Sequence, residues 1–263
     1  MTAALCPHVD TARHRLADEG YVEACRRRLD DDGALVLAGF FRPEVVARVV
    51  ADESSRVGEA FFADSTHNVY LTEPDPDLPA EHPFNRQVAS SKGLLADDQI
   101  AASSPLREFY EDPSVRTFLS GVLGIDRLHP YADDVSSINV HFAGAGQELG
   151  WHFDNSAFAV TMLLQAPEGG GNFEYVPHVR GDGIDSAAEY AAVERVLDDA
   201  ATVRRLDFSP GDLVVFRGRD ALHRVTPTEG PATRILVVFA FNERAGVRLS
   251  DSALATFYGR VVP

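Results

Sequence analysis

The sequence is poor in cysteine and in long apolar runs. Its 263 residues include two cysteines, Cys6 and Cys25, both close to the N-terminus. Two cysteines cannot build a disulfide framework, so the sequence favours a reducing compartment, and we expect a cytoplasmic protein. The longest apolar runs, such as residues 235–241, have the length of a strand and are far too short to span a membrane. The N-terminus also lacks the charged-then-apolar pattern of a signal peptide, so no membrane partner is expected.

Positive charge is scarce as well. Lysine and arginine together number 24 against 40 aspartates and glutamates, which gives a formal net charge of −16. With no basic stripe visible, nucleic acid is not expected as a partner, because the phosphate backbone would be repelled. A small anionic ligand remains compatible, because a pocket can be locally positive. Lys92 is the only lysine beside 23 arginines, a ratio that we interpret as the coding bias of a GC-rich genome.

The pattern of the chain predicts helices first and strands later. Helical spacing covers residues 9–30, 42–57 and roughly 103–123, and a short apolar strand follows Gly33. Residues 70–87 are rich in proline and aspartate and predict a long loop. Short strands with glycine and proline turns begin near residue 135, and a helical insertion is predicted at 181–203. This order predicts an α+β fold with a sandwich or barrel. The candidate strands lie within 135–144, 156–165, 168–177, 208–218 and 233–243.

His152 and Asp154 form a His-x-Asp pair at the start of an apolar run. About one such pair is expected by chance at this composition, and a second, His8 and Asp10, lies in the N-terminal tail. Residues i and i+2 point the same way from a strand, so one strand can deliver two metal ligands. A non-haem iron(II) oxygenase needs two histidines and one carboxylate on one face of the metal. His223, just beyond a predicted buried strand, is the candidate third ligand.

An arginine that could bind an anion follows the second histidine in the sequence. Arg234 begins the next strand, eleven residues after His223. A buried guanidinium can hold a carboxylate through two parallel hydrogen bonds. The far carboxylate of a 2-oxoglutarate cosubstrate requires such a partner, although a structural salt bridge is the plainer alternative for Arg234.

The order of His152, Asp154, His223 and Arg234 resembles that of the iron(II)/2-oxoglutarate-dependent dioxygenase superfamily. The segments "PEGGGNFEYVP" and "SPGDLVVFRG" resemble its double-stranded β-helix core. "NVYLTEPDPDLPAEHPFNR" together with "HFDNSAFAVTMLLQAPEGGGNFEYVP" resembles the branch of the free-amino-acid radical halogenases and their hydroxylase relatives. The resemblance implies a jelly-roll, cupin-like core with N-terminal helices packed on it. It implies one domain over residues 1–263: a mostly helical part with a loop (1–130), the β-helix core (131–245) and a C-terminal segment (246–263).

The resemblance also implies an activity. Its cofactors would be Fe(II), 2-oxoglutarate and O2, with succinate and CO2 released, and its substrate a free amino acid or a derivative. In the halogenases a glycine replaces the carboxylate ligand and leaves room for chloride, whereas Asp154 is present here. Hydroxylation of an unactivated C–H bond is therefore implied, with desaturation, cyclisation or halogenation as alternatives.

Further residues are predicted to line the pocket. Asn139 and His141 share the polar face of one strand, which either holds 2-oxoglutarate and substrate or is a solvated edge. Arg86 lies where the resembled branch holds the amino acid carboxylate, although a solvated loop charge explains it equally well. Asn155, directly after Asp154, is a similar alternative. The loop 66–98 and the insertion 181–203 are expected to cover the pocket.

Two other classes of protein remain open. A double-stranded β-helix can bind a ligand or metal without catalysis, and it would then release no succinate. A zinc hydrolase can also use two histidines and an acid, but the sequence contains no His-Glu-x-x-His helix.

Overall fold

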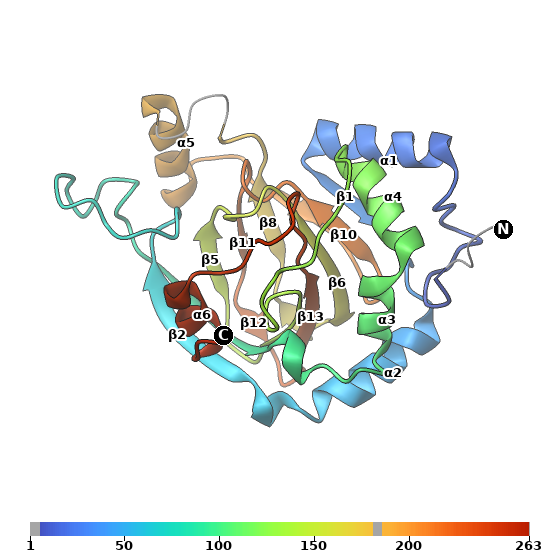
Figure 1. Ribbon diagram of the computed structural model, residues 1–263. Helices are drawn as coiled ribbons and strands as arrows, with labels where there is room; N and C mark the ends of the chain where they lie inside the picture. The colour runs from blue at the N-terminus through green and yellow to red at the C-terminus, as the bar shows by residue number, and fades with distance from the viewer. Residues whose placement is uncertain (1–5, 181–185, 263) are drawn as a thin grey trace.

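The computed structural model describes residues 6–180 and 186–262, and its centre is an 11-stranded antiparallel sheet (Figure 1). The strand order is β1-β10-β6-β13-β4-β3-β5-β11-β8-β9, and β2 also pairs with β3. The strands are β1 (Ala34–Leu37), β2 (Phe61–His67), β3 (Val88–Leu95), β4 (Ile138–Ala143), β5 (Leu149–His152), β6 (Ala159–Gln165), β8 (Phe173–Val176), β9 (Arg204–Leu206), β10 (Leu213–Phe216), β11 (Leu222–Val225) and β13 (Arg234–Phe239). A separate pair consists of β7 (Gly169–Gly170) and β12 (Thr228–Glu229).

Strand β3 joins the two halves of the sheet. Its C-terminal part pairs with β4, where Gly93 is the partner of Phe142. Its N-terminal part pairs with β5, where Ser90 is the partner of Leu149. The sheet therefore separates at β3 into two layers that face each other across a common interior (Figure 1). This nearly closed antiparallel barrel confirms the predicted α+β, double-stranded β-helix fold.

The layer β1-β10-β6-β13-β4 is buried on both faces. Along β10, Leu213 and Val215 belong to the large core under the helices, while Val214 and Phe216 belong to a cluster between the layers. The alternation follows from the period of two in a strand. Burial on both faces explains why β10 and most of β13 are continuous apolar runs in the sequence.

Helices cover the outer face of that layer. They are α1 (Glu19–Asp32), α2 (Pro43–Ser54), α3 (Pro105–Glu111) and α4 (Pro113–Leu123), and their apolar faces form one core with the sheet (Figure 1). Asp18 caps α1 by accepting from the Tyr21 N–H, and Gly33 ends the helix in a left-handed conformation. Asp112 ends α3 and caps α4, so the predicted helix 103–123 is two helices that meet before Pro113.

Two further helices pack on the other layer and at one end of the barrel. Helix α5 (Ala187–Leu197) lies within the predicted insertion 181–203, of which residues 181–185 are outside the described residues. Together with the 68–87 loop it packs on Trp151 and Phe153, which point away from the interior. Helix α6 (Asp251–Tyr258) contacts β2 and β3 and packs on Leu94.

Two expectations from the sequence differ from the structure. The helix predicted at 9–30 begins at Glu19, because turns and a bridge between Val9 and Phe41 occupy the residues before it. The loop predicted at 66–98 is a loop only at 68–87, because β3 occupies 88–95 in the middle of the sheet. The segment "VASSKGLL" does not predict a strand, because Ser90, Ser91 and Lys92 interrupt the apolar alternation.

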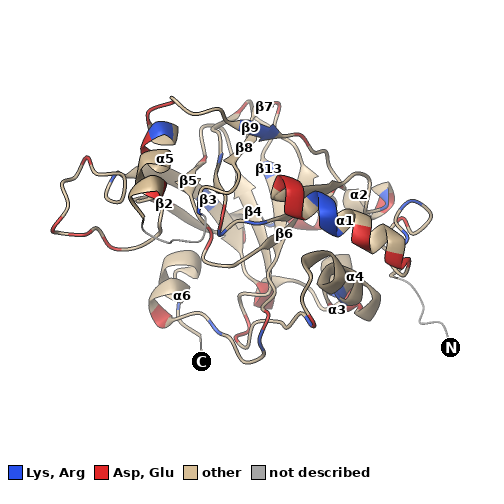
Figure 2. Ribbon diagram, turned by 90° about the horizontal axis from the view of Figure 1, so that it is seen from above, with Lys and Arg blue, Asp and Glu red and all other residues tan. Residues whose placement is uncertain are grey.

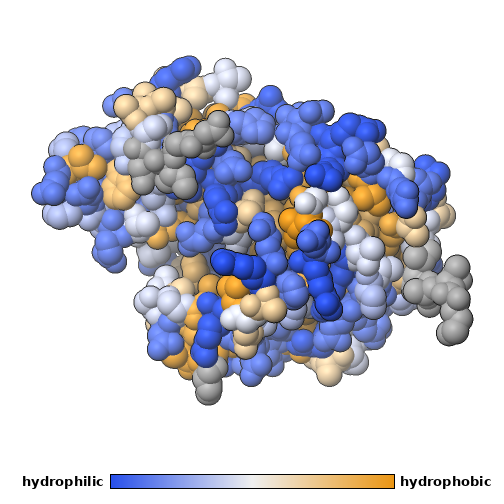
Figure 3. Space-filling view, turned by 45° about the horizontal axis from the view of Figure 1, so that its top comes forward, coloured by the Kyte–Doolittle hydropathy of each residue, from blue (hydrophilic) through white to orange (hydrophobic). Residues whose placement is uncertain are grey.

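The outer surface is mixed in charge and mostly hydrophilic. Helix α1 carries both acidic and basic residues in Figure 2, and the face in Figure 3 shows apolar side chains in small patches. Exposed large apolar side chains include Phe61, Phe62 and Phe257. Within 6–180 and 186–262, no helix combines the length and apolar character needed to cross a membrane.

Candidate metal centre

Three side chains converge on one point between the layers. Nε2 of His152 and Nε2 of His223 each lie 3.5 Å from Oδ1 of Asp154. His152 ends β5 and His223 lies on β11, and the two are direct partners across the ladder. Potential ligand atoms of all three residues lie within 4.8 Å of one another. Two imidazoles and one carboxylate form a donor set that suits a divalent first-row transition metal.

The backbone determines which ring nitrogen of each histidine faces the centre. Nδ1 of His152 donates to the Gly150 carbonyl (2.8 Å), and Nδ1 of His223 donates to the Ala221 carbonyl (2.9 Å). Where such a ring carries no proton on Nε2, this nitrogen has a free lone pair directed at the centre. Burial, together with the nearby His223, lowers the pKa of His152 to about 4, so this ring is neutral and available as a ligand at pH 7.

The carboxylate is ionised and held in a tight space. Burial opposes ionisation of Asp154, but His223 and His152 outweigh it and hold its pKa well below the ordinary range. The Asp154 N–H donates to the Gly218 carbonyl (3.0 Å). A Cβ added at Gly218 would collide with Oδ2 of Asp154. Gly218 is thus a site residue that sequence analysis missed, and its "FRGRD" context carries no distinctive signal.

Substitution of Gly218 by alanine is expected to weaken metal binding roughly 10- to 100-fold, the usual cost of disturbing the support of a metal ligand. The reason is that the new methyl group must push the Asp154 carboxylate away from the two Nε2 atoms. Isothermal titration with Ni²⁺ measures the effect. Gly58→Ala is the matched control, since nothing lies within 4 Å of a Cβ added there. Equal Ni²⁺ affinities of the Gly218→Ala and Gly58→Ala variants would show that metal binding does not depend on the present position of the Asp154 carboxylate.

A cavity of about 400 Å³ lies beside Arg234. Its lining includes Leu163, Phe173 and Phe208, and Phe173 also stacks on the His223 ring with centroids 5.5 Å apart. Arg234 is only 7% exposed, and its guanidinium has no hydrogen bond or ion pair with any described residue. Burial lowers its pKa to about 10, so the group remains charged at neutral pH. A buried, unpartnered guanidinium beside a cavity suits a carboxylate ligand.

Two other arginines close to His223 in the sequence already have partners. Arg224 pairs with Glu174 (2.8 Å) and lies over the Trp151 ring on the outer side of its layer. Arg217 pairs with Asp30 (2.7 Å) on α1. Both charges are already partnered, which favours Arg234 among the candidates for an anion-binding residue.

A hydrogen-bonded chain links the 68–87 loop to His152. The Gly150 N–H donates to Oγ of Ser90 (2.9 Å), and Oγ lies 2.6 Å from Nε2 of His67. Nδ1 of His67 donates to the Asn68 carbonyl (2.9 Å), so in the neutral ring Nε2 accepts from the Ser90 hydroxyl. The Gly150 carbonyl also accepts from Nδ1 of His152. This series of hydrogen bonds therefore supports the orientation of His152, a potential metal ligand.

The structure places the three predicted substrate residues in different surroundings. His141 is half-buried on β4, on the inward face, and burial together with the Lys92 and Arg234 charges holds its pKa well below the ordinary range. Arg86 pairs with Asp198 (2.6 Å) and donates to the Leu197 carbonyl at the end of α5. Asn155 is exposed, next to Asp154. The substrate roles of all three stay predictions.

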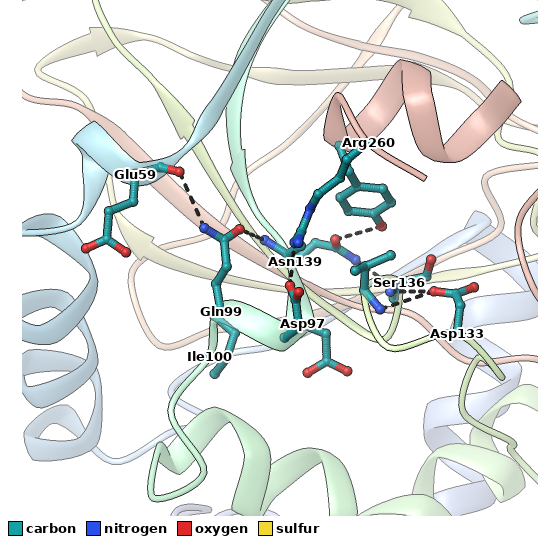
Figure 4. A network of polar contacts seen from close by, with 12 residues as sticks. Glu59, Asp97, Gln99, Ile100, Asp133, Ser136, Asn139 and Arg260 are labelled. Carbon is teal, nitrogen blue, oxygen red and sulfur yellow. Dashed lines mark hydrogen bonds and ion pairs between the residues drawn. The ribbon is translucent and has the colours of Figure 1, made fainter. Parts of the chain in front are cut away.

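Asn139 lies at the α6 end of β4 (Figure 4). Its amide oxygen accepts from the Tyr258 hydroxyl (2.9 Å), and its amide nitrogen donates to the Ser136 carbonyl (2.9 Å). These contacts tie the sheet to α6 and lend no support to the predicted cofactor role of Asn139, which stays a prediction. A second cavity, about 430 Å³, lies nearby beside Asp97 and Asp133, and none of the three converging residues lines either cavity.

Comparisons with solved structures identify the fold. The chain is similar to an oxidoreductase of the 2OG-Fe(II) oxygenase family from Burkholderia pseudomallei, with a TM-score of 0.56, 13% identity, and coverage of 88% of this chain and 95% of that one. It is also similar to HygX from Streptomyces hygroscopicus, solved with nickel, 2-oxoglutarate and hygromycin B, with a TM-score of 0.53, 15% identity, and coverage of 85% and 88%. The fold is therefore that of the 2OG-Fe(II) oxygenases, a superfamily of enzymes.

A family model described as halogenase D matches residues 17–254, and the chain belongs to this family. The superfamily and branch inferred from the sequence are thereby confirmed. A formate dehydrogenase from Chaetomium thermophilum is 35% identical over 82 residues, which are 31% of this chain. The chain spans 22% of the length of that protein.

Proposed function

We propose that this protein is an iron(II)- and 2-oxoglutarate-dependent oxygenase that hydroxylates an unactivated C–H bond of a small molecule. The observation that carries the proposal is the convergence of two Nε2 atoms on the Asp154 carboxylate at 3.5 Å. His152, Asp154 and His223 would hold the iron. When bound, iron(II) supplies the chemistry that couples decarboxylation of 2-oxoglutarate by O2, giving succinate and CO2, to oxidation of the substrate.

The protein's own share is binding and exclusion of side reactions. Arg234 would pair with the far carboxylate of 2-oxoglutarate in the cavity beside it. Phe173 and Phe216 pack against the His223 ring, with Phe216 edge-on at 4.9 Å, and keep this side of the centre apolar. Nδ1–H of both ligand histidines remains committed to the backbone, so the rings keep one tautomer.

Replacement of Arg234 by methionine is expected to raise the KM for 2-oxoglutarate steeply while metal affinity stays nearly unchanged. Truncation of a buried charged partner costs about 2–5 kcal/mol. Steady-state succinate release measures the KM, and Arg48→Met, at an exposed position on α2, is the control. An unchanged KM would show that another residue binds the cosubstrate.

Asp154 favours hydroxylation over halogenation. A carboxylate occupies the position at which chloride would bind, so the substrate is expected to receive oxygen. Halogenation is the second candidate, because the family that the chain belongs to is described as a halogenase family. The mass of the product in the presence of chloride separates the two: added oxygen supports the first, and the chlorine isotope doublet supports the second.

The substrate is proposed to be a free amino acid or a derivative, and the location to be the cytoplasm. Both follow from the sequence resemblance and composition described above. The iron-loaded protein would be incubated with single free amino acids, 2-oxoglutarate and O2, and succinate and product mass recorded. Oxygen-dependent succinate release that an amino acid stimulates supports the proposal. No succinate release under any condition would favour a non-catalytic binding protein or a hydrolase.

A further inference from the structure

Lys92 faces the interior of the barrel from β3, the strand that pairs with β5. In the β3–β4 ladder, Leu94 is the partner of His141, and the same register continued by two residues places Lys92 beside Ala143. Ala143 is in turn the partner of Arg234 on β13. Lys92, Ala143 and Arg234 therefore lie side by side across three strands and on the same inward face as His141. Two interstrand spacings separate the backbones of the two cations, which is about 10 Å.

The ammonium of Lys92 has no partner in the protein. Lys92 is half-buried, and within the described residues it makes no hydrogen bond or ion pair. Burial lowers its pKa to about 8, and the negative charge of Asp154 partly opposes this. Lys92 lies on β3, the strand next to β5 and His152, and Ser90 on the same face of β3 contacts Gly150 of β5, whereas Arg234 lies on β13, two strands further from β5. Lys92 is thus the cation on the metal side of the interior, and Arg234 is the cation on the far side.

The two positive charges on this inward face, those of Lys92 and Arg234, favour the binding of a dianion. Lys92 and Arg234 are two unpartnered cations, whereas the ionised Asp154 belongs to the metal centre. Holding two such cations in a barrel is costly unless a ligand compensates them. A diacid placed between them, with one end at the metal, satisfies both.

The composition of the chain also supports a role for Lys92 in binding an anion. Arginine stands at 23 of the 24 lysine and arginine positions, so a general need for positive charge is met by arginine. The single lysine stands on β3, next to the strand that ends at His152. An ammonium is a compact point charge, while a guanidinium is a wide planar fork that would need more space next to a metal and its ligands.

Resting on the proposed function, we propose that Lys92 binds the carboxylate adjacent to the keto group of 2-oxoglutarate, at the metal, while Arg234 binds the far carboxylate. Lys92 is then a binding residue of the cosubstrate that complements Arg234. The two cations together explain selection of a diacid over a monoacid, and Lys92 alone retains affinity for any 2-oxo acid.

The test measures binding and does not depend on turnover. Nickel-loaded wild type, Lys92→Met and Arg234→Met are titrated by calorimetry with 2-oxoglutarate and with 2-oxopentanoate, which lacks only the far carboxylate. Lys92→Met is expected to weaken both ligands by a similar factor, about 10- to 100-fold, as for loss of a hydrogen bond to a charged group. Arg234→Met is expected to weaken 2-oxoglutarate alone. Arg48→Met, exposed on α2, removes the same charge and is the control for long-range effects.

Other outcomes overturn the inference. If Lys92→Met weakens only 2-oxoglutarate, Lys92 serves the far carboxylate, and if it weakens neither ligand, Lys92 binds no cosubstrate. If the wild-type protein binds no 2-oxoglutarate, the proposed function itself fails. Thermal unfolding separates binding from a structural role: removal of an unpartnered buried ammonium should leave the melting temperature unchanged or raise it. Lys92→Gln replaces the methionine variant if that variant does not fold.

Discussion

Replacement of His152 by alanine is expected to lower the affinity for Fe²⁺ or Ni²⁺ by more than about 100-fold and to abolish succinate release. Loss of a ligand must cost more than loss of a residue that only supports a ligand, for which 10- to 100-fold is usual. Because the pKa of His152 is about 4, protons do not compete for the ring at pH 7. Calorimetric titration with Ni²⁺ measures the binding, and mass spectrometry measures succinate.

His129→Ala is the control for this variant. His129 lies in a short bridge to Asn242, away from the three converging residues. The His129→Ala variant should retain wild-type metal affinity and activity. Metal binding and turnover that survive the loss of His152 would mean that the centre is not formed by His152, Asp154 and His223.

Removal of the carboxylate by Asp154→Gly is expected to lower hydroxylation on the order of 100-fold and to yield at most a trace of chlorinated product. The substitution opens a coordination position and leaves Gly218 facing an empty space. Chlorination also requires a chloride site and a substrate held in the correct orientation, and the surrounding groups that determine these are unchanged. The mass of the product formed in the presence of chloride is compared with that formed in the presence of bromide. The two masses measure both hydroxylation and halogenation.

Efficient chlorination by Asp154→Gly would contradict this expectation. It would show that the interior is already organised for a halide, and the hydroxylase assignment of the wild type would then need direct evidence from its product. Asp154→Asn is the matched variant, because it removes the charge and keeps the side-chain volume. It should lose hydroxylation without opening space for chloride.

The triad and Arg234 could be predicted from the sequence because their chemistry depends on spacing along the chain. His152 and Asp154 are two residues apart at the end of one strand, and His223 and Arg234 are separated by a fixed strand and turn. The apolar strands β10 and β13 were also predictable, since burial on both faces leaves a continuous apolar run.

Lys92, Gly218 and Ser90 could not be found in this way. Lys92 and Ser90 lie in a strand whose polar residues interrupt the apolar alternation that marks strands elsewhere. Gly218 matters through the absence of a side chain next to Asp154, and Ser90 matters through a contact across two strands. Both contacts depend on how segments distant in the sequence meet.

The pairing of His152 with His223 across β5 and β11 has a consequence for metal identity. The ladder fixes the distance between the backbones of the two directly opposite histidines, and the separation of their imidazoles follows from it. Both rings are also locked by their own backbone, so neither loses much freedom when an ion arrives. A preformed pair of this kind discriminates poorly among ions of similar size. Cobalt, nickel and iron should then bind in the intrinsic order of divalent metals, and the supply of metal in the cell would decide which one the protein carries.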